Sequence, residues 1–409
     1  MNDCPEPLQG ASWRERALKV IPFGSSTNSK APTLLPEEPE VILRGDGCRV
    51  WDDRGREFID YRCALGAVLL GYANPVVDAA IREQLAQGIV FGHPHPLETT
   101  TAELFCSLVP GAQAARFLKT GGEALAAVIR IARAWTGRDH VVQIGYNGWL
   151  NSLANGSRVL PGASADRVPG VPAPLAALHH VVEWDDRDTM QGLFDELGQD
   201  IALVLVAAHY PAIPSASGFY HYLRQLTSDH GALLAYDEMV TGFRVAVGGM
   251  AQFTGVTPDL AVYGKGVANG MPLSVYAGRR DVLSVLDRGE VVVTSTHGGE
   301  TLSLAAASAT MTILRDQPVT SHLYEVGERF RDGVNALLAE RGLAATLEGC
   351  GVCPQFVAES PHLVDDLLRS AFRHGVSLYR VCYVTAAHSI ADIDLTLERL
   401  AAAWDDLAT

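Results

Sequence analysis

Hydrophobic residues are spaced in two different ways in the N-terminal quarter of the chain. Residues 50–61 alternate apolar and polar side chains around an Asp-Arg-Gly turn, which predicts a β-hairpin. In residues 75–87 apolar side chains recur every three or four positions, which predicts an amphipathic helix. A second helix is predicted over residues 98–108. A hairpin followed by helices is therefore expected before the main body of the protein.

After residue 115 the pattern changes to short apolar runs separated by longer helical or loop segments. The runs are RFLKT, HVVQIG, HHVVEW, ALVLVAA, ALLAYDE and LAVYGKG. Short β-rich runs that alternate with helices are typical of a buried, mostly parallel sheet with helices on both faces. We therefore predict an α/β fold whose large domain spans residues 75–310.

The remaining sequence predicts a second, smaller α/β domain over residues 311–409. Its predicted elements are a helix over residues 323–341, a strand over 351–358, a second helix over 363–374 and a terminal helix from 391 onward. We expect residues 1–74, including the hairpin, to pack against this smaller domain.

Residues 151–174 interrupt the alternation of strands and helices. They are rich in glycine, proline, serine and asparagine. A segment of this length without regular structure inside a compact domain usually has a function, so we predict a lid over a binding site.

Composition and charge narrow the classes of function. The 409 residues are 48% hydrophobic and 19% charged, which excludes a disordered or fibrous chain. The net charge of −15 disfavours nucleic acid and anionic membranes as partners. The sequence has no apolar run long enough to span a bilayer and no signal-peptide pattern at its start, so we expect a cytoplasmic enzyme that acts on a small molecule. Its seven cysteines are odd in number and are expected to be reduced.

Two of the apolar runs end in charged groups, Asp237 and Lys265. Ligands bind at the carboxyl ends of strands in open α/β sheets, so these two side chains should meet at one crevice. Lys265 lies between Gly264 and Gly266 after an apolar run, and partial desolvation there would lower its pKa and make the amine nucleophilic toward carbonyls.

Five motifs in a fixed order extend this pair. They are T-G-G-E-A, G-Y-N-G, D-E-x-x-T-G-F-R, V-T-P-D-L-x-x-x-x-K-G and T-H-G-G, at residues 120–124, 145–148, 237–244, 256–266 and 296–299. With them the chain resembles the class-III aminotransferases, which are pyridoxal-phosphate enzymes of fold type I, and among these glutamate-1-semialdehyde aminomutase most. The resemblance runs from about residue 21 to the C-terminal helix.

The resemblance implies roles for three side chains around a pyridoxal 5'-phosphate cofactor. Lys265 would form the internal aldimine and later transfer a proton between the substrate carbon and the cofactor carbon. Asp237 would pair with the pyridinium nitrogen and keep it protonated, so that the ring accepts electrons. Tyr146 would stack on the cofactor ring.

The resemblance also implies a phosphate site and a partner. The backbone amides of Gly121 and Gly122, at a turn that opens a helix, would hold the cofactor phosphate, as helix N-termini hold anions. Thr296 corresponds to a threonine that in this family reaches the phosphate of the neighbouring subunit's cofactor. A homodimer with shared active sites follows.

Several positions depart from the family pattern. Residues 207–209 read Ala-Ala-His where Glu-Pro is common, Asn147 replaces a histidine, and Glu300-Thr301 replaces Asn-Pro. In the aminomutase an arginine near the N-terminus holds a carboxylate, whereas the corresponding stretch here is PFGSSTNSK and ends in Lys30. Lysine lacks the bidentate fork that matches a carboxylate.

These departures favour a sugar over a carboxylate as substrate. Ser26 and Asn28 belong to a hydroxyl-rich stretch suited to hydrogen bonds with a polyol or amino sugar. Together with the motif G-K-G-V-A-N-G they resemble the pyridoxal-phosphate enzymes of aminoglycoside antibiotic pathways, and the acidic chain suits a polycationic substrate. The predicted function is transfer of an amino group from a donor such as glutamate to an oxidised amino-sugar carbon, through pyridoxamine phosphate.

Two other functions stay open. The first is an isomerase that removes and returns a proton at an amine-bearing carbon, with Cys382 or Tyr146 as the second acid or base. The second is a protein that binds pyridoxal phosphate without catalysis.

Histidine and cysteine pairs elsewhere in the sequence do not amount to a metal site. Cys350 and Cys353 form a C-x-x-C motif, but no second pair stands at zinc-site spacing, and we expect both in a buried strand. His93 and His95 also lack further ligands. Since the matching family segment approaches the partner's active site, His93 remains a candidate substrate contact.

Overall fold

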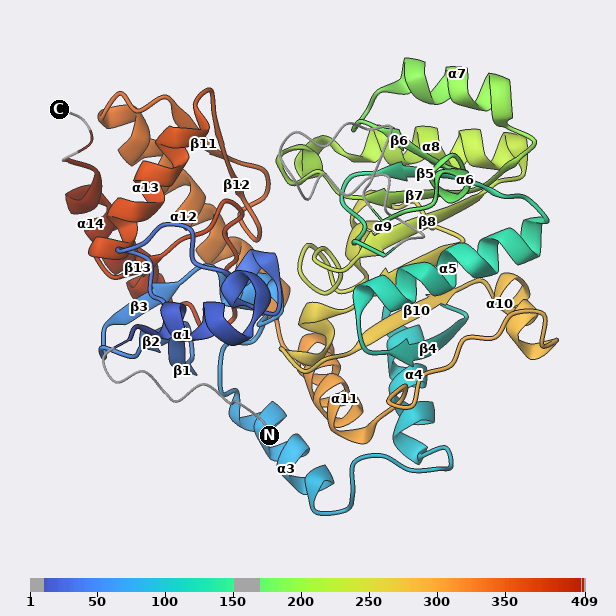
Figure 1. Cartoon of the computed structure of the whole chain (residues 1–409), viewed down its shortest axis with the longest axis horizontal. Helices are drawn as coiled ribbons and strands as arrows, with labels where there is room; N and C mark the ends of the chain where they lie inside the picture. Colours follow the sequence, from blue (N-terminus) through green and yellow to red (C-terminus); the bar gives the residue numbers. More distant parts are fainter. Residues whose placement is uncertain (1–10, 151–169, 406, 408–409) are drawn as a thin grey trace.

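A seven-stranded sheet forms the centre of the larger part of the molecule. The structure is a computed structural model that describes residues 11–150, 170–405 and 407 (Figure 1). The strand order is β4-β10-β9-β8-β7-β5-β6. In chain order these strands are β4 (Ala114–Leu118), β5 (His140–Ile144), β6 (His179–Val182), β7 (Ile201–Ala207), β8 (Leu233–Glu238), β9 (Leu260–Tyr263) and β10 (Ser274–Gly278). Pairing is parallel from β9 to β6, whereas β10 runs antiparallel to β4 and β9. The predicted α/β fold with a mostly parallel sheet is confirmed.

Helices cover both faces of this sheet (Figure 1). One face packs against α5 (Gly121–Thr136) and α10 (Arg280–Asp287), and the other against α7 (Arg187–Leu197) and α8 (Ser217–His230). Residues of β7 contribute to both of the resulting apolar clusters, alternately from Leu203 to Val206, and six of its seven residues are buried. A strand covered on both faces needs a nearly continuous apolar run, and ALVLVAA is such a run.

The local sequence fixes both ends of α5. The Thr120 hydroxyl accepts a hydrogen bond from the Glu123 N–H, and the Glu123 carboxylate accepts one from the Thr120 N–H, which is a capping box. The helix ends at Gly137, whose φ of 69° suits glycine. The N-terminus of α5 is thereby held at the edge of the sheet where β5, β7 and β8 also end.

The smaller part of the molecule joins the two ends of the chain. Strands β1 (Ile42–Asp46), β2 (Arg49–Asp52) and β3 (Glu57–Asp60) form an antiparallel sheet, to which β13 (Val376–Ser377) adds in parallel next to β3. Helices α12 (Val319–Glu340), α13 (Pro361–Arg373) and α14 (Ile390–Asp405) pack beside it with the hairpin of β11 (Ala345–Glu348) and β12 (Gln355–Ala358).

Cys350 and Cys353 do not lie in a strand, so that prediction was wrong. They occupy the turn between β11 and β12. The Cys353 N–H donates to the Cys350 carbonyl at 3.2 Å and closes the turn, and the following Pro354 has no N–H for a ladder. Both side chains are buried, as expected.

The remaining elements connect or flank these two parts. They are α1 (Trp13–Val20), η1 (Pro22–Gly24), η2 (Asn28–Lys30), α2 (Cys63–Gly66), α3 (Pro75–Leu85), α4 (Pro96–Leu108), α6 (Ala173–Ala176), η4 (Tyr210–Ser215), α9 (Gly249–Thr254), η5 (Lys265–Ala268) and α11 (Thr301–Asp316). None of the helices in the described ranges is long and apolar enough to cross a membrane. The predicted lid, residues 151–174, lies outside the described residues except for its last five positions.

Candidate active site

A cavity of about 230 Å³ lies at the carboxyl ends of the parallel strands. Its lining comes from the segments that follow β5, β7, β8 and β9 and from the start of α5. Among the described residues that line it, Lys265 is the one cation and Asp237 the one anion. The structure thus brings together the two charged strand ends that the sequence indicated.

Asp237 is a buried carboxyl with spare hydrogen-bonding capacity. It lies near the end of β8, is 9% exposed, and its Oδ1 accepts a hydrogen bond from the Met239 N–H at 3.0 Å. Burial raises its pKa to about 6, although the Met239 hydrogen bond and the Lys265 charge act in the opposite direction. A carboxylate in this setting gains from a cationic N–H donor placed in the cavity.

Lys265 follows β9 after one intervening residue and opens η5. Its φ of 47° is in the left-handed region, which residues other than glycine adopt only when the surrounding structure enforces it. Burial lowers the pKa of its amine, Asp237 raises it, and Arg244 lowers it further. Its amine has no hydrogen-bond or ion-pair partner within the described part of the chain. It is therefore available to react with a carbonyl group.

Gly121 and Gly122 form the first turn of α5 and line the cavity with their backbone. A Cβ added to Gly121 would lie 2.5 Å from Sδ of Met239, and one added to Gly122 would lie 3.2 Å from Leu150. Only glycine leaves room there for another group to approach the N–H groups, and a helix N-terminus with accessible N–H groups binds anions.

Three aromatic side chains form walls of the cavity. Tyr146 and Trp149 follow β5 and are 62% and 70% exposed, and Tyr210 follows β7. Burial raises the pKa of the Tyr146 hydroxyl, with a further contribution from Asp237. The sequence interpretation missed Trp149, Tyr210 and Met239, although all three lie within a few residues of strand ends, where the rule that found Asp237 also applies.

Comparisons with known proteins agree with this geometry. Residues 36–403 match the model of the family described as aminotransferase class-III. The chain is 33% identical to a glutamate-1-semialdehyde 2,1-aminomutase of Aquifex aeolicus, over 97% of this chain and 99% of the relative, and 32% identical to the enzyme of the same name from Thermus thermophilus, over 96% and 98%. The chain belongs to the class-III aminotransferase family.

Solved structures extend the comparison for this class-III aminotransferase. A transaminase with pyridoxal phosphate bound superimposes with a TM-score of 0.90 at 25% identity, over 98% of both chains. The pyridoxal-phosphate form of the FumI protein from Sphingopyxis sp. MTA144 gives 0.88 at 27% identity, over 97% of this chain and 95% of that one. These likenesses confirm fold type I.

The cofactor of this class-III aminotransferase is pyridoxal 5'-phosphate, and the cavity fits it. An open helix N-terminus suits the phosphate, and the buried Asp237 carboxyl suits a ring N–H. The Lys265 amine, without a partner among residues 11–150 and 170–405, suits the aldehyde. These three features belong to α5, β8 and η5, which meet around one space.

Other predicted site residues of this class-III aminotransferase lie away from the cavity. Thr296 is exposed in the turn before α11, and its neighbours Thr294, Ser295 and Gly298 line a different cavity of about 560 Å³. Four predicted substrate contacts, none of which lines the cavity in the described chain, are also exposed: Ser26, Asn28, Lys30 and His93. Cys382 is fully buried, and its thiol donates to the Tyr379 carbonyl at 3.3 Å.

The departures from the family pattern have clear structural places. Ala207 and Ala208 line the cavity where family members commonly carry an acidic group. Asn147 is buried and donates from Nδ2 to the carbonyls of Ile144 and Gly145 at 3.0 and 3.2 Å, so it fixes the loop that carries Tyr146. His95 caps α4 and accepts from the Leu97 N–H.

Proposed function

We propose that this class-III aminotransferase moves an amino group from a donor such as glutamate to an oxidised carbon of an aminoglycoside-type amino sugar. The observation that supports it most is the lining of the Lys265 cavity. Lys265 is the one cation among the described lining residues, so these residues offer no guanidinium to hold a substrate carboxylate.

The walls of the same cavity suit a polyamine with an apolar ring face. Tyr146, Trp149 and Tyr210 present aromatic surfaces, which attract ammonium groups by cation–π interaction. Ala207 and Ala208 leave space where a larger acidic side chain is common in the family. The net charge of −15 attracts a polycationic substrate over longer distances.

We assign roles to the residues around the cofactor accordingly. Pyridoxal phosphate, when bound, supplies an aldehyde that exchanges with amines and a ring that accepts the electrons released at the substrate carbon. Lys265 would bind the aldehyde and would move the proton at the reacting carbon through its Nζ. Asp237 would hold a proton on the ring nitrogen, Tyr146 would cover the ring, and the N–H groups of Gly121 and Gly122 would bind the phosphate.

A substrate panel tests the proposal. The holoenzyme is mixed with aminoglycosides, with ω-amino acids and with glutamate 1-semialdehyde, and the cofactor absorbance and product masses are recorded. We expect kcat/KM for an aminoglycoside amine to exceed that for an ω-amino acid by at least about tenfold, the order that one cation–π contact supplies. Conversion of glutamate 1-semialdehyde while amino sugars are ignored would refute the amino-sugar proposal.

Trp149 offers a matched variant for this panel. Trp149→Ala should raise KM for the aminoglycoside by about tenfold, because it removes an aromatic wall, and should leave the reaction of a small amine such as alanine within about twofold. Trp149→Phe keeps a ring and should lie between. Equal losses for both substrates would show a structural role instead.

An isomerase is the second candidate, because the aminomutase relatives are named as isomerising enzymes. Of its two proposed second acids, Tyr146 lines the cavity and Cys382 does not. In deuterated water, an isomerase incorporates deuterium at the amine-bearing carbon and epimerises it without any amino acceptor. A strict requirement for an acceptor supports transfer.

We also propose a homodimer with shared sites. Thr296 is exposed and does not line the Lys265 cavity of its own chain, which suits a residue that completes a partner's site. Apolar side chains beside it are exposed as well: Ile89, Val90, Phe91 and Val292 are 42 to 66% exposed, and the Ile89 carbonyl accepts from the N–H of Thr301. Light scattering should give twice the 43.8 kDa of one chain. A monomer with full activity would contradict the dimer.

A further inference from the structure

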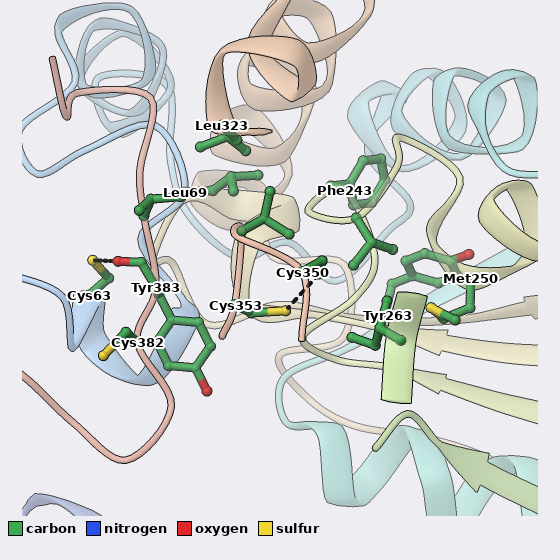
Figure 2. Packing of buried hydrophobic residues seen from close by; sticks show 14 of the residues in the cluster. Cys63, Leu69, Phe243, Met250, Tyr263, Leu323, Cys350, Cys353, Cys382 and Tyr383 are labelled. Atoms are coloured by element: carbon green, nitrogen blue, oxygen red, sulfur yellow. Dashed lines mark hydrogen bonds between the residues drawn. The ribbon is translucent and has the colours of Figure 1, made fainter. Parts of the chain in front are cut away.

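The turn between β11 and β12 contains two thiols that the proposed chemistry does not use. Cys350 and Cys353 are 4% and 0% exposed, and their Sγ atoms are 3.8 Å apart. Figure 2 shows this contact at the centre of the buried cluster, with Cys63 and Cys382 apart from it. Two thiols in contact within one tight turn are the arrangement from which a local disulfide forms.

The two sulfur atoms are not equivalent. A hydrogen bond from the Cys353 side chain lowers the pKa of Cys350, whereas the same contact and burial raise the pKa of Cys353. Cys350 is also the more exposed of the two residues, at 4% against 0% for Cys353. It is therefore the better nucleophile toward a small oxidant, with Cys353 placed to resolve the product.

We propose that Cys350 and Cys353 form a reversible disulfide with hydrogen peroxide, and that this bond slows the reaction in the Lys265 cavity. Cys350 Sγ attacks one peroxide oxygen, the O–O bond breaks, and one water leaves as a sulfenic acid forms. Cys353 Sγ then attacks the Cys350 sulfur, the S–O bond breaks, and a second water leaves. The two thiols lose two electrons and two protons, and the peroxide is reduced to two waters. A dithiol such as dithiothreitol reverses the step by exchange.

The turn touches the wall of the Lys265 cavity on one side. A Cβ on Gly349 would lie 2.4 Å from the carbonyl oxygen of Tyr210, and Tyr210 lines the cavity. Gly351 in the same turn packs directly on α12, where a Cβ would lie 2.3 Å from the N atom of Glu328. The turn is therefore held between a helix backbone and the cavity wall.

A buried arginine also holds the turn. Arg244, 1% exposed, donates to the Val352 carbonyl at 3.2 Å and also to the carbonyls of Val384 and Gly66, at 2.7 and 3.2 Å. A disulfide has an S–S distance of about 2.05 Å, so the sulfurs must approach well inside their present separation. Because backbone atoms of Tyr210 and Glu328 pack closely against the turn, a shift of the turn as the disulfide closes is transmitted to Tyr210.

Peptide mapping of the wild-type holoenzyme tests the proposal first. The protein is treated with increasing hydrogen peroxide, its free thiols are alkylated, and the peptides are analysed by mass spectrometry. We expect one peptide containing Cys350 and Cys353 to lose two hydrogen masses and escape alkylation. The rate of the cofactor absorbance change with an amine donor should fall by about threefold, the scale of coupling between neighbouring sites, and dithiothreitol should restore it.

Two variants locate the effect. Cys353→Ser should lose the reversible response, whereas Cys106→Ser, which removes a more accessible thiol on α4, should keep it. The proposal fails if both thiols remain alkylatable at peroxide concentrations that slow the enzyme. It also fails if the disulfide forms without a change in rate. The wild-type mapping needs no variant, so a folding defect in Cys353→Ser leaves the test intact, and the sugar specificity of the enzyme does not enter it.

Discussion

The end of β8 carries two neighbouring carboxyls in very different surroundings. Asp237 accepts a hydrogen bond from one backbone N–H, whereas Glu238 accepts from the Thr241 hydroxyl and from the N–H groups of Met250 and Ala251, at 2.7 and 3.3 Å for the last two. Two cations, Lys265 and Arg244, differ in the same way in the number of their hydrogen-bond partners. Lys265 has no partner in the described chain, and Arg244 donates to three carbonyls.

This contrast shows which property separates reactive from structural charges. Burial raises the pKa of both carboxyls, to about 6 for Asp237 and about 7 for Glu238, so burial and a shifted pKa do not distinguish them. Spare hydrogen-bonding capacity does, because a buried polar group without enough partners costs stability and persists where a ligand supplies the missing contact. Asp237 and Lys265 line the cavity. Glu238 and Arg244, whose hydrogen bonds are made within the protein, are buried away from the cavity lining.

Replacement of Lys265 should give the largest effect. Lys265→Ala removes both the amine that binds the cofactor aldehyde and the proton carrier, so turnover should fall by about 10⁴-fold. Since this amine has no hydrogen-bond or ion-pair partner among the described residues, the urea midpoint of the cofactor-free variant should not decrease. Borohydride reduction followed by peptide mapping should label Lys265 in the wild type and no lysine in the variant. A label on another lysine would contradict the assignment.

Asp237→Asn should lower turnover by about 10²–10³-fold, because the amide cannot hold a proton on the ring nitrogen. The free energy of unfolding of the cofactor-free variant should instead increase. The folded-state pKa of about 6 lies above the ordinary 3.8 of aspartate, so folding takes up a proton between these values and the cofactor-free protein loses stability as the pH rises through this window. At pH 7.5 the variant should be more stable by up to about 3 kcal/mol, a gain that disappears below pH 4. Urea unfolding at both pH values measures it.

Arg244→Met tests the structural charges, whose hydrogen bonds are satisfied within the protein. It leaves three carbonyls without their donor, and the free energy of unfolding should fall by about 3 kcal/mol. Arg244→Lys keeps the charge with fewer directed donors and should lose less. A loss below about 1 kcal/mol for Arg244→Met would mean that these hydrogen bonds do not hold the two parts of the molecule together.

Gly121→Ala changes neither a reactive nor a structural charge, and it should give the smallest effect of these substitutions. The new methyl group must displace Sδ of Met239, which is a flexible side chain, so the fold should survive. The displaced sulfur should crowd the cavity and weaken cofactor affinity by about tenfold. Gly122→Ala, whose Cβ meets Leu150 at 3.2 Å, provides the matched control and should lose less. Equal affinities in all three proteins would show that the cavity tolerates a side chain here.

Sequence patterns were sufficient where one short segment determines the outcome. The parallel strands β7, β8 and β9 are built on apolar runs, and the two charged groups lie at the end of β8 and just after β9. Strand β10 (SVYAG) was missed because it runs antiparallel to both of its neighbours, and its pairing with β4 and β9 is not visible in the local sequence. The C-x-x-C segment was placed in a strand because its apolar character was visible, but its turn hydrogen bond was not.

Site residues that depend on tertiary structure were beyond the sequence patterns. Whether Cys382 reaches the cavity depends on the packing of the smaller part of the molecule, and the structure buries it elsewhere. Tyr210 joins the cavity because η4 turns back toward Asp237 after β7. No local pattern specifies such a turn.

The pairing of β3 with β13 has a consequence for biosynthesis. The Ser377 hydroxyl donates to Asp60 across 317 positions of the chain, so the edge of β3 has no neighbour until nearly the whole polypeptide has left the ribosome. At about 5–20 residues per second, this strand edge waits roughly 15 to 60 seconds. During that interval the exposed edge of β3 is open to mispairing with other strands.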